Sequence, residues 1–214
     1  MKLGIVGTGA MGKMVAAYAA EGDFFSSIVL IEPTDDKTWP SEKVDLLIDF
    51  SHPEAIRSVY EYCRNHGGNI PVVIGTTGYG PDGWEIINLL RKICPVEKRT
   101  NFSRGIDALN MLAAQAKDML GKDADIRVLE AHHRYKKDAP SGTAKTLCSY
   151  VGIAPEEYEE KVAVQRMGTI VGEHSVFFAL EDEVIEIRHT AASKRIFAAG
   201  AVEAGKKLLI DISG

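Results

Sequence analysis

Short apolar runs alternate with longer segments of mixed polarity through the first hundred residues. The apolar runs have the length and composition of strands, and the segments between them suit helices. We predict strands over residues 2–7, 28–32, 44–50 and 71–76, and helices over residues 11–20, 53–66 and 82–94. Strands separated by helices imply right-handed crossovers and a parallel sheet. The first part of the chain is therefore predicted to be an α/β domain with a Rossmann-type, doubly wound parallel sheet.

The pattern changes after residue 101. An amphipathic helix is predicted over residues 104–120 and a Gly- and Ala-rich helix over 195–209, with strands between them over 126–131, 161–166, 175–180 and 184–190. Partial alternation in the last strand favours a mixed or antiparallel sheet with one wetter face. This predicts a second, α+β domain. The small residues of the last helix suit close packing on a neighbour such as the first domain.

Composition narrows the class of protein. The 214 residues carry a net charge of −5 without a block of like charge, which disfavours a nucleic-acid partner. No apolar run is long enough to span a membrane, and the N-terminal residues lack the pattern of a secretory signal. Three widely spaced cysteines fit reduced thiols better than a disulfide framework. We therefore expect a cytoplasmic protein that binds neither nucleic acid nor membrane.

A glycine-rich turn joins the first predicted strand to the first predicted helix. Gly7, Gly9 and Gly12 match Gly-x-Gly-x-x-Gly, with Ala10 and Met11 inside the motif. The first glycine permits the tight turn, the second lets a pyrophosphate approach, and the third allows the helix to pack on the strand. The helix N-terminus then offers N–H groups to the phosphates. The motif predicts a dinucleotide site, with a purely structural turn as the alternative.

Three further segments end strands at the same edge of the predicted sheet. Glu32 lies where a carboxylate can accept hydrogen bonds from an adenosine ribose, although it could also be an ordinary solvated glutamate. Gly75, Thr76 and Thr77 leave room for a ligand and offer two hydroxyls, which is a weak signal by itself. Asp49 either faces the cofactor or caps the helix that follows it.

The most informative stretch is residues 130–144, EAHHRYKKDAPSGTA, which follows a strand and opens a helix. Its two histidines and three cations should attract an anionic substrate and handle protons. A solvated basic loop is the alternative. A metal site is disfavoured because adjacent His132 and His133 point to opposite faces of a strand and no His-Glu-x-x-His motif is present. Ser141 is a poor nucleophile because the surrounding motif is wrong.

Together these segments resemble the dihydrodipicolinate reductase family over nearly the whole chain. The long loop motif is highly specific, and the other matching segments support it. They are residues 7–12, 48–51, 75–78, 101–103, 130–144, 171–174 and 197–202. Three positions depart from the family's pattern. The glycine turn is one residue shorter, with Ala10 where an arginine often stands; residues 94–100 are more polar than a fifth strand should be; and Thr169 replaces a common aspartate.

The resemblance implies a domain organisation, a reaction and residue roles. Residues 1–103 and 195–214 would bind the nicotinamide dinucleotide, and residues 104–194 would bind substrate and assemble a homotetramer. The reaction would deliver hydride to C4 of a small cyclic dicarboxylate, with loss of water, giving tetrahydrodipicolinate. His132 and Lys136 would be catalytic, His133, Gly142 and Thr143 would bind substrate, and the cofactor would contact Gly7, Gly9, Ala10, Met11, Gly12, Glu32, Gly75, Thr76, Thr77, Asn101 and Phe102.

Cofactor choice follows from charge. The carboxylate of Glu32 can bind the ribose hydroxyls of NADH but repels the phosphate of NADPH. Lys13 and Lys37 are flexible cations that could still reach that phosphate. We expect NADH to be preferred, with NADPH as a second donor. Two other functions stay open: a different Rossmann-type reductase of small amino or keto acids, and a non-catalytic NAD(H)-binding regulator.

Overall fold

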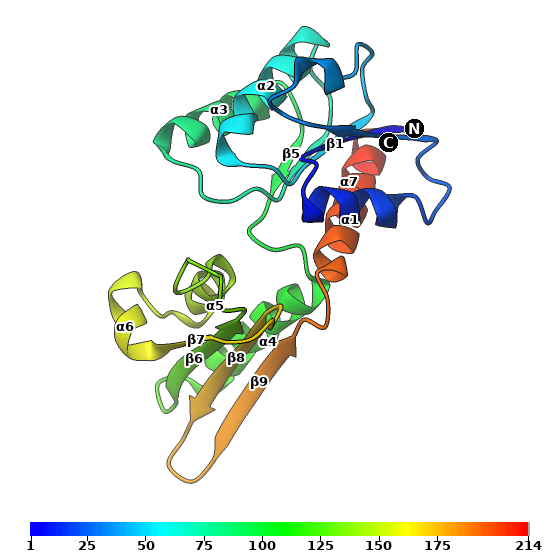
Figure 1. Ribbon diagram of the computed structural model, residues 1–214. Coiled ribbons are helices and arrows are strands. Elements are labelled where there is room, and N and C mark those ends of the chain that lie inside the picture. The colour runs from blue at the N-terminus through cyan, green and yellow to red at the C-terminus, as the bar shows by residue number, and fades with distance from the viewer. Residues whose placement is uncertain (214) are drawn as a thin grey trace. The chain divides into compact units, whose positions relative to one another are not determined.

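The computed structural model describes residues 1–213 and divides into two compact units (Figure 1). The first unit contains Met1–Phe102 and the C-terminal segment that begins at Arg195, and the second contains Ser103–Lys194. The expected boundaries, 103/104 and 194/195, lie within one residue of these. None of the described helices is long and apolar enough to cross a membrane.

The first unit is built on a five-stranded sheet in which every pair of neighbouring strands is parallel. The order is β2-β1-β3-β4-β5, with β1 at Lys2–Val6, β2 at Ser27–Ile31, β3 at Leu46–Asp49, β4 at Val72–Ile74 and β5 at Val96–Lys98. The predicted doubly wound parallel sheet is confirmed. The polar segment 94–100 does contain a fifth strand. Its polarity fits its edge position, where all three strand residues stay partly exposed.

Helices cover both faces of this sheet (Figure 1). They are α1 (Ala10–Ala19), α2 (Ile56–Asn65), α3 (Pro81–Arg91) and α7 (Arg195–Ser213). Two short 3₁₀ turns also occur: η1 (Asp36–Thr38) lies between β2 and β3, and η2 (Pro53–Ala55) directly precedes α2. Alternate residues of β3 supply the two cores: Leu47 packs on the α2 and α3 side, and Leu46 and Ile48 on the α1 and α7 side. The small residues of α7 let it lie against α1 and β3.

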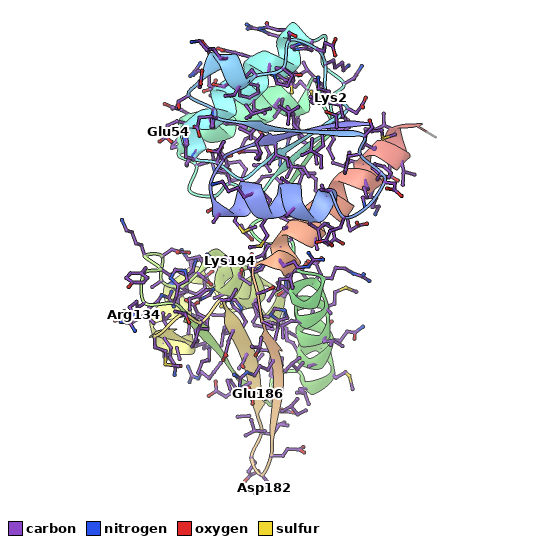
Figure 2. The ribbon with its side chains drawn as sticks, turned by 45° about the vertical axis from the view of Figure 1, so that its right-hand side comes forward. Lys2, Glu54, Arg134, Asp182, Glu186 and Lys194 are labelled. Carbon is purple, nitrogen blue, oxygen red and sulfur yellow. The ribbon has the colours of Figure 1, made fainter. Side chains whose placement is uncertain are left out.

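The second unit contains a four-stranded mixed sheet in the order β7-β6-β8-β9. Strand β6 (Asp125–His132) runs parallel to β7 (Val162–Arg166) and antiparallel to β8 (Glu173–Ala179), which pairs with β9 (Val184–Thr190) in an antiparallel hairpin. Figure 2 shows Asp182 at the tip of that hairpin. The predicted α+β domain with a mixed sheet is confirmed. One correction is that β6 extends to His132, so this histidine lies on the strand rather than in the loop.

One face of the second sheet is covered by α4 (Arg104–Leu120) and α5 (Gly142–Val151), and the short helices η3 (Pro155–Glu157) and α6 (Tyr158–Lys161) precede β7. Val128 of β6 and its register partner Val176 of β8 are buried in this core. The opposite face carries polar side chains that pair across the strands, such as Ser175 with Glu186 and Glu173 with Arg188. Along β9 this opposite face is the more exposed one, as the partial alternation of that strand predicts.

Candidate functional site

The glycine turn between β1 and α1 has the geometry that the motif predicts. Gly7 has a φ of +109°, and a Cβ there would lie 2.4 Å from the carbonyl oxygen of Phe50. A Cβ on Gly12 would lie 1.9 Å from the carbonyl oxygen of Gly7, so only glycine lets α1 approach the strand end. Space beside Gly9 is open. Ala10 and Met11 form the first turn of α1, which has no acidic residue and no side-chain cap.

This helix start fits a dinucleotide phosphate. The unpaired N–H groups at the N-terminus of α1 and its positive dipole end favour an anion, and nothing in the first turn competes for them. The open space beside Gly9 lets a bulky ligand reach the backbone. The site therefore has the donors and the room that a pyrophosphate needs.

Glu32 follows β2 and is tied to the glycine turn. The Thr8 hydroxyl donates a hydrogen bond of 2.6 Å to Glu32 Oε2, and Thr34 donates one of 3.3 Å to Oε1. The Thr8 hydrogen bond is the main reason that the pKa of Glu32 is lowered. Glu32 is therefore an ionised, partly exposed carboxylate beside the turn, where an adenosine ribose is expected.

Asp49 links the ends of two neighbouring strands. Its buried carboxylate accepts hydrogen bonds from Ser51 N at 3.0 Å and from the Tyr79 hydroxyl at 3.2 Å. Burial raises the pKa of Asp49 despite these donors. The helix-capping interpretation of Asp49 is wrong, because the residue at the N-cap of η2 is His52 and no side chain caps that turn.

The remaining expected cofactor residues differ in accessibility. The ring of Phe50 occupies the space beside Gly75, where a Cβ would lie 2.2 Å from Phe50 Cε1. Thr76 is buried and its hydroxyl accepts a hydrogen bond from Ser51 N, whereas Thr77 is exposed. Asn101 is partly exposed. The side chain of Phe102 packs in the α1 and α7 core, so only its backbone can meet a ligand.

A buried polar cluster interrupts the core face of the second sheet. Glu130 and His132 of β6 lie on the same face as Val128, because alternate strand residues share a face. Glu130 pairs in register with His174 of β8. All three polar side chains are buried: Glu130 is 0% exposed, His132 is 8% and His174 is 3%. The apolar stripe of this sheet thus ends in a carboxylate and two imidazoles.

Glu130 is the centre of this cluster. Its Oε1 accepts hydrogen bonds from Arg166 Nη2 at 2.7 Å and from Ser141 N at 3.1 Å, and its Oε2 contacts His132 Nδ1 directly. Among the described residues, Oε2 and Nδ1 have no hydrogen-bond partner, so this close contact is the one polar interaction given for either atom. Burial raises the pKa of Glu130, but His132 and Arg166 outweigh it and lower the pKa to about 2. The Glu130 carboxylate is therefore ionised at neutral pH.

His174 packs edge-on against His132. The centroids of the two rings are 5.2 Å apart, and His174 Nε2 lies 3.4 Å from the Ser141 hydroxyl. Burial, together with the nearby His132, lowers the pKa of His174 to about 3. His174 is therefore neutral across the working range of pH.

The loop after β6 brings the predicted substrate residues to the start of α5. Lys136 Nζ forms an ion pair of 2.9 Å with Asp138. His133 is half-buried, and burial and the Lys194 charge lower its pKa. Ser141 caps α5 by accepting a hydrogen bond from Ala144 N, a structural role that agrees with the rejection of Ser141 as a nucleophile.

Gly142 and Thr143 form the first turn of α5. This turn contains no acidic residue, so its N–H groups suit a carboxylate. Figure 2 marks Arg134 on the same loop. The structure thus brings His132 and the start of α5 together through Glu130, which contacts both.

The donor atoms of Glu130, His132 and His174 lie within 4.8 Å of one another, a spacing that could hold a divalent cation. Two features oppose this. Arg166 and Ser141 N already occupy Oε1 of Glu130, and the contact between Glu130 and His132 leaves no room for an ion between them. The expectation of no metal therefore stays a prediction.

Sequence reasoning assigned no role to Glu130, His174 or Arg166. Glu130 and Arg166 lie on the adjacent strands β6 and β7. His174 lies on a third strand, β8, and only the register between β6 and β8 brings it beside Glu130. The period-2 alternation from Val128 could have placed Glu130 and His132 on one face. His174 lies in the matching segment 171–174, but no local pattern points to its place beside Glu130.

Two family models match the chain: dihydrodipicolinate reductase, N-terminus, over residues 1–102, and dihydrodipicolinate reductase, C-terminus, over residues 105–213. The 4-hydroxy-tetrahydrodipicolinate reductase of Alkaliphilus metalliredigens is 36% identical, over 96% of this chain and 92% of the relative. The 4-hydroxy-tetrahydrodipicolinate reductase of Campylobacter jejuni subsp. jejuni serotype O:6 is also 36% identical, over 95% of this chain and 91% of the relative. A solved dihydrodipicolinate reductase with bound dipicolinate, from Paenisporosarcina sp. TG-14, shares the fold with a TM-score of 0.73 at 19% identity, over 98% of this chain and 95% of that one. This chain therefore belongs to the dihydrodipicolinate reductase family.

Proposed function

We propose that this protein reduces 4-hydroxy-tetrahydrodipicolinate to tetrahydrodipicolinate with a reduced nicotinamide dinucleotide, in lysine and diaminopimelate biosynthesis. Loss of hydroxide takes up one proton to form water and releases one ring proton, and hydride addition to the unsaturated ring takes up a second proton, so that overall one hydride and one proton enter and one water leaves. The observation that carries the proposal is the loop of residues 130–144, which joins a buried, carboxylate-bound histidine to a basic segment and a helix N-terminus. The names of the curated relatives support the same reaction.

The first unit would hold the dinucleotide. The open backbone at Gly9 and the uncapped start of α1 suit the pyrophosphate, and the ionised Glu32 suits the ribose hydroxyls. When bound, the reduced nicotinamide supplies the hydride. Because Glu32 carries a negative charge, we propose that NADH is preferred and that NADPH serves as a second donor.

The second unit would hold the substrate and handle its protons. His132 and Lys136 are the proposed acids, since hydride addition and loss of hydroxide each require a proton nearby. Thr143, with the N–H groups of the first turn of α5, would bind one substrate carboxylate, and His133 would bind the other. The solved relative was obtained with dipicolinate, a planar dicarboxylate of this size, which supports the assignment.

Assembly and location are part of the proposal. The uncovered face of the second sheet carries the partly buried Phe177, and Val184 at its end is 61% exposed. A second copy packed on this face would bury both side chains, which supports a homotetramer built through the second unit. The free thiols of Cys63, Cys94 and Cys148 support a cytoplasmic location.

Anaerobic stopped-flow mixing of the enzyme, NADH and freshly generated substrate tests the proposal. Substrate-dependent oxidation of NADH to tetrahydrodipicolinate is the expected result. Binding of NADH without turnover would favour a regulator. Turnover only with small amino or keto acids would favour a different reductase on the same fold.

A further inference from the structure

We propose that Glu130 is a positioning residue that keeps the proton of His132 on Nδ1 and thereby makes Nε2 the atom that exchanges a proton with the substrate. This inference deepens the proposed function and rests on it. It concerns a side chain to which the sequence analysis assigned no role and which contacts the proposed catalytic histidine.

The contact fixes the tautomer of His132. An ionised carboxylate can only accept hydrogen bonds, and Glu130 stays ionised because His132 and Arg166 both favour its charged form. Nδ1 of His132 meets this carboxylate and no other acceptor. In a neutral imidazole the ring nitrogen that meets an acceptor carries the hydrogen, so Nε2 has the free lone pair. Nε2 is then the atom that takes up the second proton and, as imidazolium, delivers it to the substrate.

Space is left on the Nε2 side of the ring. Gly172 lies there, and a Cβ at that position would be 3.1 Å from His132 Nε2 and 3.8 Å from His174 Cε1. A side chain at residue 172 would therefore crowd the nitrogen that must meet the substrate. The two residues lie at opposite edges of the His132 ring. Glu130 contacts Nδ1, and Gly172 has no side chain that would crowd Nε2.

The carboxylate itself cannot turn away. Its second oxygen, Oε1, is held by Arg166 Nη2 at 2.7 Å and by Ser141 N at 3.1 Å. Ser141 is the N-cap of α5, whose first turn contains the proposed substrate residues Gly142 and Thr143. One buried carboxylate thus sets both the histidine tautomer and the position of the anion-binding helix end.

The neighbouring imidazole adds no competing charge. His174 faces the ring of His132 edge-on, and burial keeps it neutral. Glu130 is the buried carboxylate that faces Nδ1 of His132, and Arg166 balances the charge of Glu130 on the other side. The alternative is that Glu130 is only a structural anchor for Arg166 and α5.

Glu130→Gln separates the two interpretations. The amide keeps the shape of the side chain but can donate to Nδ1, which would favour the opposite tautomer. Ring ¹⁵N NMR of the free protein should show wild-type His132 with its hydrogen on Nδ1 and a shift toward Nε2 in Glu130→Gln. kcat should fall on the order of 10²-fold, the lower end of a general acid–base contribution, while KM changes less than about threefold.

Arg166→Gln is the matched control, because Arg166 contacts the other oxygen of the same carboxylate. It should leave the hydrogen of His132 on Nδ1. A tautomer change of equal size in Arg166→Gln, or none in Glu130→Gln, would overturn the proposal. If Glu130→Gln does not fold, Glu130→Asp replaces it: the shorter carboxylate should retain the Nδ1 tautomer, and its loss would also count against the proposal.

A double variant gives the kinetic test. If Glu130 acts through His132, adding Glu130→Gln to His132→Ala should lower kcat no further than His132→Ala alone. If the fold-losses in kcat of the two single variants multiply in the double variant, Glu130 has a purely structural role and the inference is contradicted. The NMR measurement needs no substrate, so it distinguishes a failure of this inference from a failure of the proposed function, which would appear as a wild-type protein that does not oxidise NADH.

Discussion

The hydroxyl of Thr8 in the glycine turn donates a hydrogen bond of 2.6 Å to the carboxylate of Glu32 at the end of β2. This contact fixes a negative charge beside the expected ribose of the dinucleotide. The contact also shows why the charge persists, because the Thr8 hydrogen bond is the main cause of the lowered pKa of Glu32. Discrimination between NADH and NADPH should therefore depend on Glu32.

We expect Glu32→Gln to reduce the preference for NADH over NADPH, because it removes the charge that repels the ribose phosphate and keeps the hydrogen bond from Thr8. The measurement is kcat/KM for both cofactors at low ionic strength, where charge repulsion is least screened. Glu42→Gln is the control, since Glu42 lies in the same unit with its side chain 85% exposed and should leave the ratio unchanged. A wild-type preference for NADPH would contradict the prediction.

Catalysis should depend on the loop after β6. His132→Ala and Lys136→Ala should each lower kcat by roughly 10²- to 10⁴-fold, because each removes a proton donor beside the substrate. The affinity for NADH, measured by fluorescence titration, should change little because the proposed dinucleotide residues belong to the other unit. Lys122→Ala, at an exposed lysine of the second unit, should keep normal turnover. Normal kcat in either loop variant would refute its assigned role.

Substrate recognition should need two carboxylates. Pyridine-2,6-dicarboxylate should inhibit competitively with the substrate, and pyridine-2-carboxylate should inhibit much more weakly, because one anchor would be lost. Thr143→Val should weaken inhibition by the dicarboxylate on the order of tenfold, the effect of losing one hydrogen bond to a charged group. Inhibition constants from steady-state kinetics provide the measurement. Equal inhibition by the two analogues would rule out the two-anchor arrangement.

The local part of each site could be predicted from the sequence. The glycine turn lies between consecutive elements, so the spacing of Gly7, Gly9 and Gly12 was enough to place it at a strand end. The fold class followed from the same alternation of apolar and polar segments. Glu32 was placed beside this turn because parallel strands end at one edge of the sheet, although its contact with Thr8 could not be foreseen.

Contacts between distant segments could not be predicted. His174 meets Glu130 only through the register of β6 and β8, which no local pattern specifies. Phe102 is expected at the cofactor, but its side chain is buried in the core of the first unit that includes α7, a helix from the far end of the chain. The predicted strand ends at Ala131, one residue early, so the sequence places His132 in a loop and misses its alternation with Glu130.

Stability in acid should depend on Glu130. Its folded pKa of about 2 lies below the ordinary value of 4.5, so its contribution is complete above about pH 5 and is lost as the pH falls toward 2. The shift corresponds to a contribution from Glu130 to the free energy of unfolding on the order of 3 kcal/mol, since one pKa unit is about 1.4 kcal/mol. Urea unfolding at a series of pH values should show this decline in the wild type. Glu130→Gln lacks the titrating group, so its free energy of unfolding should be lower than that of the wild type at neutral pH and should fall less steeply as the pH drops. If the free energy of unfolding falls equally steeply with pH in the two proteins, Glu130 does not hold its charge in the folded state.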